Sequence, residues 1–278
     1  MKLLIIGHSV LDHIKIGNEF SVSPGGIYYA VRQINNMKTS DDEIYLCSQI
    51  DDQSYEYFKP EFEKVNKEFL EKVDSIPKVH LVIHKAVERH EAYENITNNL
   101  QLRLINFNSF DGILINMITG FDISLEQLQN IRKNSSALIY FDVHTFSRGL
   151  AENYVRNFRL IPDFDQWLKY LDIVQVNQFE LFTISEKKSE AEIVEEIISY
   201  GVKYFCVTKG KQGAKVYYNR NGEINSYFIS ARKANNPHLI GCGDVFGAAF
   251  FYSYIRKRDV VESLKDAIEA AELLVNKE

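Results

Sequence analysis

Cysteine and proline are scarce in this chain of 278 residues. The 3 cysteines lie far apart and lack metal-ligand spacing, which disfavours a disulfide framework or a cysteine zinc site and is typical of reduced thiols in a cytoplasmic protein. There are only 5 prolines and no low-complexity tract, so no interdomain linker can be recognised. We therefore expect one domain over residues 1–278.

Excess basic charge and long apolar runs are also missing. Lys and Arg total 32 against 38 Asp and Glu, a net charge of -6, which disfavours a nucleic-acid partner. No apolar run approaches the roughly 20 residues of a membrane-spanning helix. The opening stretch MKLLIIGHSVLDHIK has too short an apolar run, and no small-residue cleavage site, for a signal peptide. We expect a cytoplasmic protein with neither nucleic-acid nor membrane partners.

Short apolar runs alternate with helical patterns along the chain. Near-continuous apolar runs are typical of strands covered on both faces, and they occupy 3–7, 43–50, 112–118, 137–143, 173–177 and 204–208. Helical patterns occupy 28–36, 53–73, 125–133, 165–171, 190–201, 245–255 and 259–277. This alternation predicts an α/β fold with a doubly wound, mostly parallel sheet.

One region interrupts the alternation. Residues 79–107 read as three short strands joined by polar turns, with no helix between them. We expect a small antiparallel β lid, formed by about 13–22 and 78–107 and inserted in the domain. A merely decorative subdomain is an equal alternative.

Polar residues follow several of the predicted strands. In doubly wound sheets, ligands bind outside the carboxyl ends of the strands, so these residues should converge on one crevice. Each is a weak signal alone, since a residue such as Asn177 is more often a helix cap. The residues are Gly7, Asp12, Asp142, Asn177, Glu180, Thr208, Gly210 and Gly213.

The stretch PHLIGCGDVFGAAFFYSYI, residues 237–255, places a carboxylate at the start of an apolar helix. Alone, Asp244 is most simply a helix N-cap. That reading leaves Gly241 and Gly243 without a role, whereas a glycine loop entering a helix N-terminus forms an anion site. An anion site beside a carboxylate is the arrangement that phosphoryl transfer to an alcohol requires.

Two common nucleotide-binding fingerprints are absent. TKGKQG at 208–213 is not a Walker A loop, because no GK[ST] follows. GHSVLD after the first strand is not G-x-G-x-x-G. P-loop ATPases and dinucleotide-dependent oxidoreductases are therefore disfavoured.

Together these segments resemble the ribokinase-like (PfkB) family of carbohydrate kinases over nearly the whole chain. The matching elements, in family order, are GHSVLD, PGGIYYAV, the β lid, NQFE for N-x-x-E, TKGKQG for T-x-G-x-x-G, and LIGCGDVFGAAF for the D-T-T-G-A-G-D signature.

The resemblance implies ATP- and Mg²⁺-dependent phosphate transfer to a hydroxyl of a sugar or sugar-like small molecule. Asp244 would be the base, and the anion hole would be Gly241, Cys242 and Gly243. The implied holders of Mg²⁺ (through its outer shell) and of the phosphates are Asn177 and Glu180. The implied nucleotide loop contains Thr208, Gly210 and Gly213. The implied acceptor site comprises Asp12, Gly25, Gly26, Tyr29 and Arg103.

The chain departs from the family pattern in places. His238 and Ile240 replace the family's Asp-x-Thr, so a monovalent-cation site is not carried over. The usual sugar-binding asparagine is absent; Tyr28 and Tyr29 could contact the substrate instead, and a core role for one of them is an equal alternative. Arg103 or Arg148 could reach an anionic acceptor. Alternative functions are a catalytically weak sugar or nucleotide sensor and a nucleoside kinase. A homodimer through the lid and a monomer with a charged edge are both open.

Overall fold

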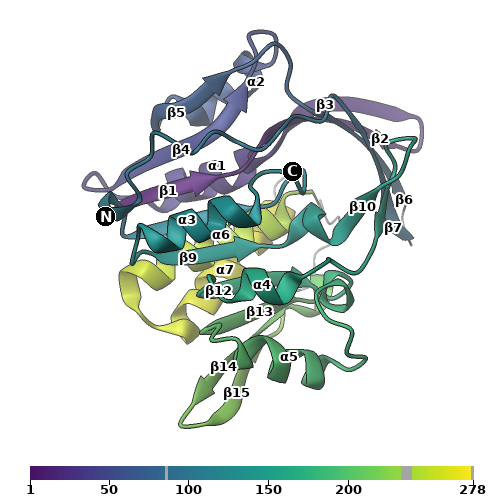
Figure 1. The fold of residues 1–278 in the computed structure, drawn as a ribbon. Helices are drawn as coiled ribbons and strands as arrows, with labels where there is room; N and C mark the ends of the chain where they lie inside the picture. The colour runs from purple at the N-terminus through teal and green to yellow at the C-terminus, as the bar shows by residue number, and fades with distance from the viewer. Residues whose placement is uncertain (85–86, 233–239, 277–278) are drawn as a thin grey trace.

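The structure is a computed structural model that describes residues 1–84, 87–232 and 240–276 (Figure 1). Its main sheet has nine strands in the order β15-β14-β13-β12-β9-β8-β1-β4-β5. Neighbouring strands are parallel throughout the part of this order that runs from β13 through β12, β9, β8, β1 and β4 to β5. The pairs β13–β14 and β14–β15 are antiparallel. Their bounds are β1 Lys2–Ile6, β4 Glu43–Ile50, β5 Asn66–Lys72, β8 Gly112–Asn116, β9 Leu138–Asp142, β12 Ile173–Asn177, β13 Tyr204–Thr208, β14 Ala214–Arg220 and β15 Glu223–Ile229.

Helices cover both faces of this sheet (Figure 1). The helices are α1 Ile27–Met37, α2 Tyr55–Phe62, α3 Leu125–Lys133, α4 Phe164–Leu168, α5 Glu190–Ser199, α6 Cys242–Lys257 and α7 Val260–Val275. Helices α1, α2, α6 and α7 share one apolar core with the sheet, and α3, α4 and α5 share the other. The doubly wound α/β fold is thus confirmed, with α6 buried along nearly its whole length.

A second sheet of four strands, in the order β3-β2-β6-β7, contains most of the residues predicted to form the lid, and we call this sheet the lid. Its strands are β2 Ser9–Ile16, β3 Glu19–Gly26, β6 Lys78–His84 and β7 Val87–Glu94. The β2–β3 and β6–β7 pairs are antiparallel, but β2 and β6 are parallel, so the lid is a mixed sheet. A two-stranded ribbon, β10 Arg148–Leu150 with β11 Arg156–Phe158, adjoins the lid through a bridge between Ala92 and Val155.

Two predicted elements are wrong. The helix predicted over 53–73 ends at Phe62, and the chain then forms the edge strand β5, whose hydrogen-bond partners are supplied by β4. The third lid strand is absent: residues 95–106 follow an irregular path to a 3₁₀ turn at Phe107–Ser109. That path is anchored by single contacts, such as the Leu100 N–H donating to the Asp122 carbonyl, rather than by a ladder.

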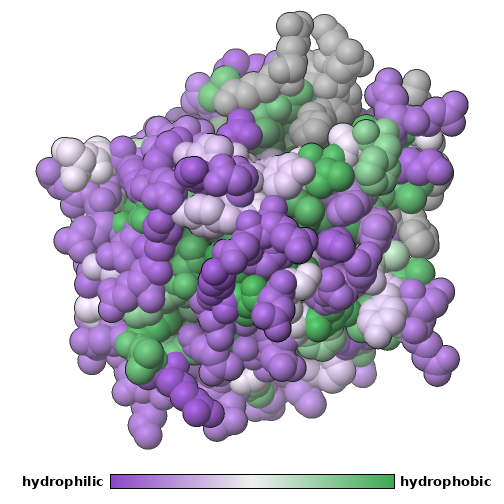
Figure 2. All heavy atoms as spheres, turned by 90° about the horizontal axis from the view of Figure 1, so that it is seen from above, coloured by the Kyte–Doolittle hydropathy of each residue, from purple (hydrophilic) through white to green (hydrophobic). Residues whose placement is uncertain are grey.

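The surface seen from above is mostly hydrophilic, with hydrophobic residues in several small patches (Figure 2). Within the described residues, none of the helices is both long and apolar enough to cross a bilayer.

Candidate active site

The carboxyl ends of four adjacent strands bring polar side chains to one edge of the main sheet. Asn116 at the end of β8 is in register with Asp142 at the end of β9. Asn177 at the end of β12 is likewise in register with Thr208 at the end of β13. The registers therefore place these four residues at the same edge of the sheet, where a ligand crevice is predicted.

Asp244 lies in the first turn of α6, above this edge, and is only 6 % exposed. The helix begins after Gly241, whose φ of 78° lies in the left-handed region that favours glycine. A Cβ at this position would lie 2.5 Å from the ring of Tyr29, so the close contact with Tyr29 also requires glycine. The backbone N–H groups of a helix's first turn have no partner within the helix, and those at Cys242 and Gly243 are the expected anion hole.

Two side chains from the sheet edge approach the Asp244 carboxylate. Asn116 donates a hydrogen bond from Nδ2 to Asp244 Oδ1 over 2.7 Å, and both groups are buried. Nε2 of His144, in the 3₁₀ turn His144–Ser147 after β9, lies 3.9 Å from the same oxygen. Asp244 is not the N-cap of α6, because Gly241 occupies that position and Asp244 lies inside the helix.

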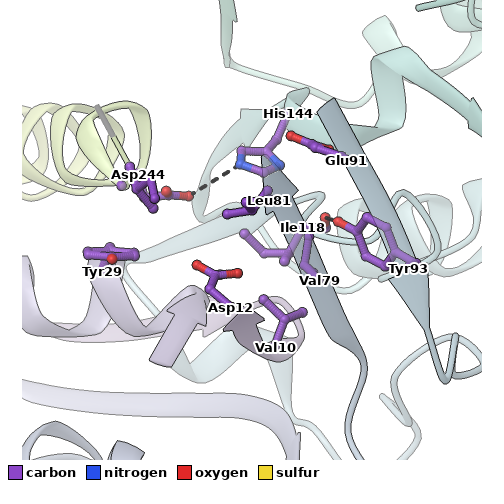
Figure 3. A pocket seen from close by; sticks show the side chains of 13 residues that line it. Val10, Asp12, Tyr29, Val79, Leu81, Glu91, Tyr93, Ile118, His144 and Asp244 are labelled. Carbon is purple, nitrogen blue, oxygen red and sulfur yellow. Dashed lines mark hydrogen bonds and ion pairs between the residues drawn. The ribbon is translucent and has the colours of Figure 1, made fainter. Parts of the chain in front are cut away.

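A small pocket, with a cavity volume of about 30 Å³, lies between Asp244 and the lid (Figure 3). Its polar lining includes Asp12 from the lid strand β2, Glu91 from the lid strand β7, and Asp244 and His144 (Figure 3). A Cβ on Gly25 would lie 2.2 Å from Oδ2 of Asp12, so glycine at this position leaves room for the Asp12 carboxylate. The apolar lining comes from Val10, Tyr29, Val79, Leu81, Tyr93, Ile118 and Ile240.

Tyr29 lies between the two sides of the pocket. Burial, together with the charges of Asp12 and Asp244, raises the pKa of its phenol well above the ordinary value. The neutral phenol therefore remains a hydrogen-bonding group at all physiological pH values. Tyr28, its neighbour, packs edge-on against Phe58 in the core.

Asp142 is buried beside two other carboxylates. Burial, and then the charges of Glu180 and Asp244, raises the pKa of Asp142 well above its ordinary value. Its Oδ2 atom is buried without a hydrogen-bond partner in the described structure. A divalent cation at this position would relieve both conditions, so the residues fit Mg²⁺.

Asn177 and Glu180 are bonded to each other. Glu180 accepts hydrogen bonds from the Asn177 backbone N–H at 2.8 Å and from its Nδ2 at 2.7 Å, which fixes the carboxylate at the sheet edge. Among the described residues, no three His, Cys, Asp or Glu side chains are grouped closely enough to hold a metal by themselves. Mg²⁺ usually takes one or two protein carboxylates together with substrate phosphates and water.

The predicted nucleotide loop follows β13 directly. Gly210 and Gly213 both have positive φ values, 53° and 116°. A Cβ on Gly213 would lie 2.0 Å from the carbonyl oxygen of Ile229, so glycine is required there. Lys209 points away from the loop and forms an ion pair with Glu190 of α5, with Nζ–Oε2 at 2.6 Å.

The structure does not bring every predicted residue to the pocket. Arg103 lies in the irregular segment after the lid, is exposed, and borders a separate depression with Asn98 and Gln127. Arg148 is buried, with its guanidinium stacked 3.9 Å above the ring of Phe158 and Nε 3.9 Å from Glu91. His238 lies outside the described residues.

Three residues were not predicted from the sequence: Asn116, which bonds to Asp244, and the lining residues His144 and Glu91. Asn116, His144 and Glu91 have no motif that marks them, although Asn116 and His144 do lie at or just after strand ends. The position of Glu91 depends on how the lid folds over the sheet, which no local pattern encodes.

Comparison with known proteins agrees with this architecture. A family model described as pfkB family carbohydrate kinase matches residues 122–278, more than half of the chain. A search of curated proteins finds no match.

Solved structures share the fold over almost the full chain. A pyrophosphate-dependent kinase in the ribokinase family is 18% identical with a TM-score of 0.83, covering 99% of this chain and 95% of the other. Ribokinase from Thermotoga maritima is 17% identical with a TM-score of 0.76, covering 99% and 93%. Ribokinase from Arabidopsis thaliana, complexed with ribose and ATP, is 15% identical with a TM-score of 0.76, covering 100% and 93%.

The sheet and lid, the glycine loop that opens α6 and the family-model match agree, and this chain belongs to the pfkB family of carbohydrate kinases.

Proposed function

We propose that this protein transfers a phosphoryl group from ATP to a hydroxyl of a neutral sugar or sugar-like polyol. The observation that carries the proposal is the position of Asp244, which is held by Asn116 at the N-terminus of α6 and faces the pocket under the lid. A hydroxyl bound there can donate its proton to Asp244 while the phosphoryl group meets the N–H groups of Cys242 and Gly243.

The acceptor is assigned from the charge of the pocket. Its lining includes the carboxylates of Asp12, Glu91 and Asp244. Carboxylates accept hydrogen bonds from hydroxyl groups and repel phosphates, so a neutral polyol fits better than a sugar phosphate. The lid strands that carry Asp12 and Glu91 would close over the acceptor and exclude water.

The donor side uses the sheet edge. Asn177, Glu180 and Asp142 would hold Mg²⁺ with its water shell, and the glycine turn at 208–213 would approach the donor's phosphates. When bound, Mg²⁺ neutralises charge on the donor phosphates during transfer. Asp244 needs to be only a weak base, because a loose transition state demands little beyond orientation of the hydroxyl.

Substrate-dependent ADP formation across a panel of neutral sugars, polyols and nucleosides tests this proposal. Loss of the activity in Asp244→Asn, with acceptor binding retained, would support it. If acceptors bind but none is phosphorylated by ATP, the sensor alternative replaces it. Pyrophosphate belongs in the same panel, because a structural neighbour is a pyrophosphate-dependent kinase. A preference for nucleosides would select the nucleoside-kinase alternative.

A further inference from the structure

Among the described residues that line the pocket, His144 is the one residue other than glycine with a positive φ. Its φ of 41° is in the left-handed half of conformational space, which side chains other than glycine seldom adopt. Non-glycine residues in this region often stand at functional sites, where the surrounding structure enforces the conformation.

The surrounding turn holds His144 in this conformation. Its backbone N–H donates to the carboxylate of Asp142, and its carbonyl accepts a 2.6 Å hydrogen bond from Ser147 Oγ. The next residue, Thr145, is anchored by its N–H to the Met117 carbonyl at 3.1 Å. These bonds lock the turn to the ends of β8 and β9, so the imidazole is aimed by the main sheet and not by the lid.

The ring itself is oriented by a buried hydroxyl. Thr145 is 1 % exposed, and its Oγ1 lies 2.8 Å from Nδ1 of His144. If this hydroxyl donates to Nδ1, the neutral imidazole carries its proton on Nε2. Nε2 is the atom that faces Asp244 across the pocket (Figure 3).

The gap between Nε2 and Asp244 Oδ1 is 3.9 Å, too long for a hydrogen bond between them. A single oxygen atom can, however, lie about 2.8 Å from both atoms, which is an ordinary hydrogen-bond length. The space between the imidazole and the carboxylate therefore matches one hydroxyl group of an acceptor.

We propose that His144 is a catalytic residue that binds the reacting hydroxyl together with Asp244. The hydroxyl donates its hydrogen to Asp244 Oδ1 and accepts a hydrogen bond from Nε2–H of His144. Its remaining lone pair then points at the phosphorus atom of the donor, which is the orientation that in-line transfer needs. This role rests on the proposed kinase function and deepens it.

The O–H bond of the acceptor breaks and its proton passes to the Asp244 carboxylate. The acceptor oxygen forms a new bond to phosphorus while the bridging P–O bond of the donor breaks, and that electron pair leaves with ADP. His144 donates a hydrogen bond throughout and neither gains nor loses a proton.

Two substitutions at the same position separate this role from a structural one. His144→Leu removes the donor, and His144→Gln places an amide N–H near the position of Nε2; neither is glycine, so both retain the same backbone constraint. We expect kcat/KM to fall about 100-fold in His144→Leu, and to recover at least tenfold of that loss in His144→Gln. His80→Leu, at a lid histidine whose side chain is 45% exposed, is the matched control and should leave kcat/KM unchanged.

A spectroscopic measurement tests the geometry without catalysis. The ¹⁵N chemical shifts of His144 in the intact protein should show a protonated Nε2 and an unprotonated Nδ1, and Thr145→Val should weaken this preference. A protonated Nδ1 with a bare Nε2 would overturn the proposal, as would wild-type kcat/KM in His144→Leu. If no acceptor is phosphorylated by wild type, the kinase function fails, and the tautomer still decides whether Nε2 can donate.

Discussion

The Asn116 side chain donates to Asp244 over 2.7 Å and so joins the end of β8 to the first turn of α6. This bond fixes the position of the Asp244 carboxylate relative to the end of the main sheet. The sheet end contributes a neutral amide, which holds the carboxylate without neutralising its charge. The proposed base is thus positioned by a residue that does not itself need to touch the substrate.

Removing this amide should slow the reaction without abolishing it. In Asn116→Ala we expect kcat to fall about tenfold to 100-fold, because the Asp244 carboxylate can rotate away from the acceptor hydroxyl. KM should change much less, because Asp12 and Glu91 would still hold the acceptor. Steady-state kinetics on Asn116→Ala and on the exposed-site control Asn108→Ala measure both quantities. A change in KM with kcat intact would contradict the positioning role.

Replacing the base itself should have the larger effect. Asp244→Asn keeps the size of the side chain but cannot accept the hydroxyl proton, so kcat should fall about 10²- to 10⁴-fold. Acceptor affinity, measured by calorimetry without a phosphoryl donor, should stay within a few-fold of wild type. Retention of wild-type turnover in this variant would exclude Asp244 as the base.

Gly241 should tolerate no side chain. Gly241→Ala places a Cβ 2.5 Å from the ring of Tyr29 and also forces a left-handed backbone on alanine, at a cost of about 1–2 kcal/mol for the backbone alone. Gly222→Ala is the matched control, because its φ is 86° and nothing lies within 4 Å of the added Cβ. Urea denaturation should show a greater loss of stability in Gly241→Ala. Equal losses would show that Tyr29 moves aside at little cost.

Asp142 should make stability fall as pH rises. Burial and the charges of Glu180 and Asp244 raise its folded-state pKa, so the folded protein binds the proton more tightly than the unfolded chain. The free energy of unfolding should therefore decrease as pH rises from about 4, the unfolded-state pKa, through the folded-state pKa. Asp142→Asn removes this loss and should be more stable than wild type near neutral pH, as measured by denaturation.

Asp172 is the control of opposite sign. Burial alone would raise its pKa, but hydrogen bonds from Ile139 and Lys203 and the charge of Arg132 outweigh burial and lower it. Its contribution to stability is therefore present above the unfolded-state pKa and lost as pH falls. Asp172→Asn should destabilise the protein at neutral pH.

Added Mg²⁺ should raise the melting temperature of wild type and not of Asp142→Asn, if Asp142 helps to hold the ion.

The charge of the acceptor should decide whether it binds. A neutral polyol should be used at least 100-fold more efficiently in kcat/KM than its phosphate ester, because Asp12, Glu91 and Asp244 repel an added phosphate. Asp12→Asn should raise KM for the neutral acceptor about tenfold or more, since one acceptor of hydroxyl hydrogen bonds is weakened. An equal kcat/KM for the phosphate ester and the neutral polyol would contradict this prediction and would show that a cationic group other than these three residues binds the phosphate.

Local patterns in the sequence were sufficient for most of the main sheet. The six predicted strands occupy the centre of the sheet, where burial on both faces imposes a continuous apolar run. The exception at 53–73 has a physical cause: β5 is an edge strand with charged residues, and its pattern suits a helix equally well. Residues 66–72 form a strand because β4 offers them hydrogen-bond partners along its edge, which the sequence pattern does not show.

The sequence by itself determined the α/β alternation, the glycine turn at 241–243 and the place of Asp244 at the start of a buried helix. These features are local, because they depend on burial period and on backbone conformations that few residues adopt. Only the tertiary structure decided that Asn116, 128 residues away, holds Asp244, and that His144 and Glu91 face the same pocket. Such contacts arise where strand ends and a folded lid meet, and no spacing along the chain records those distances.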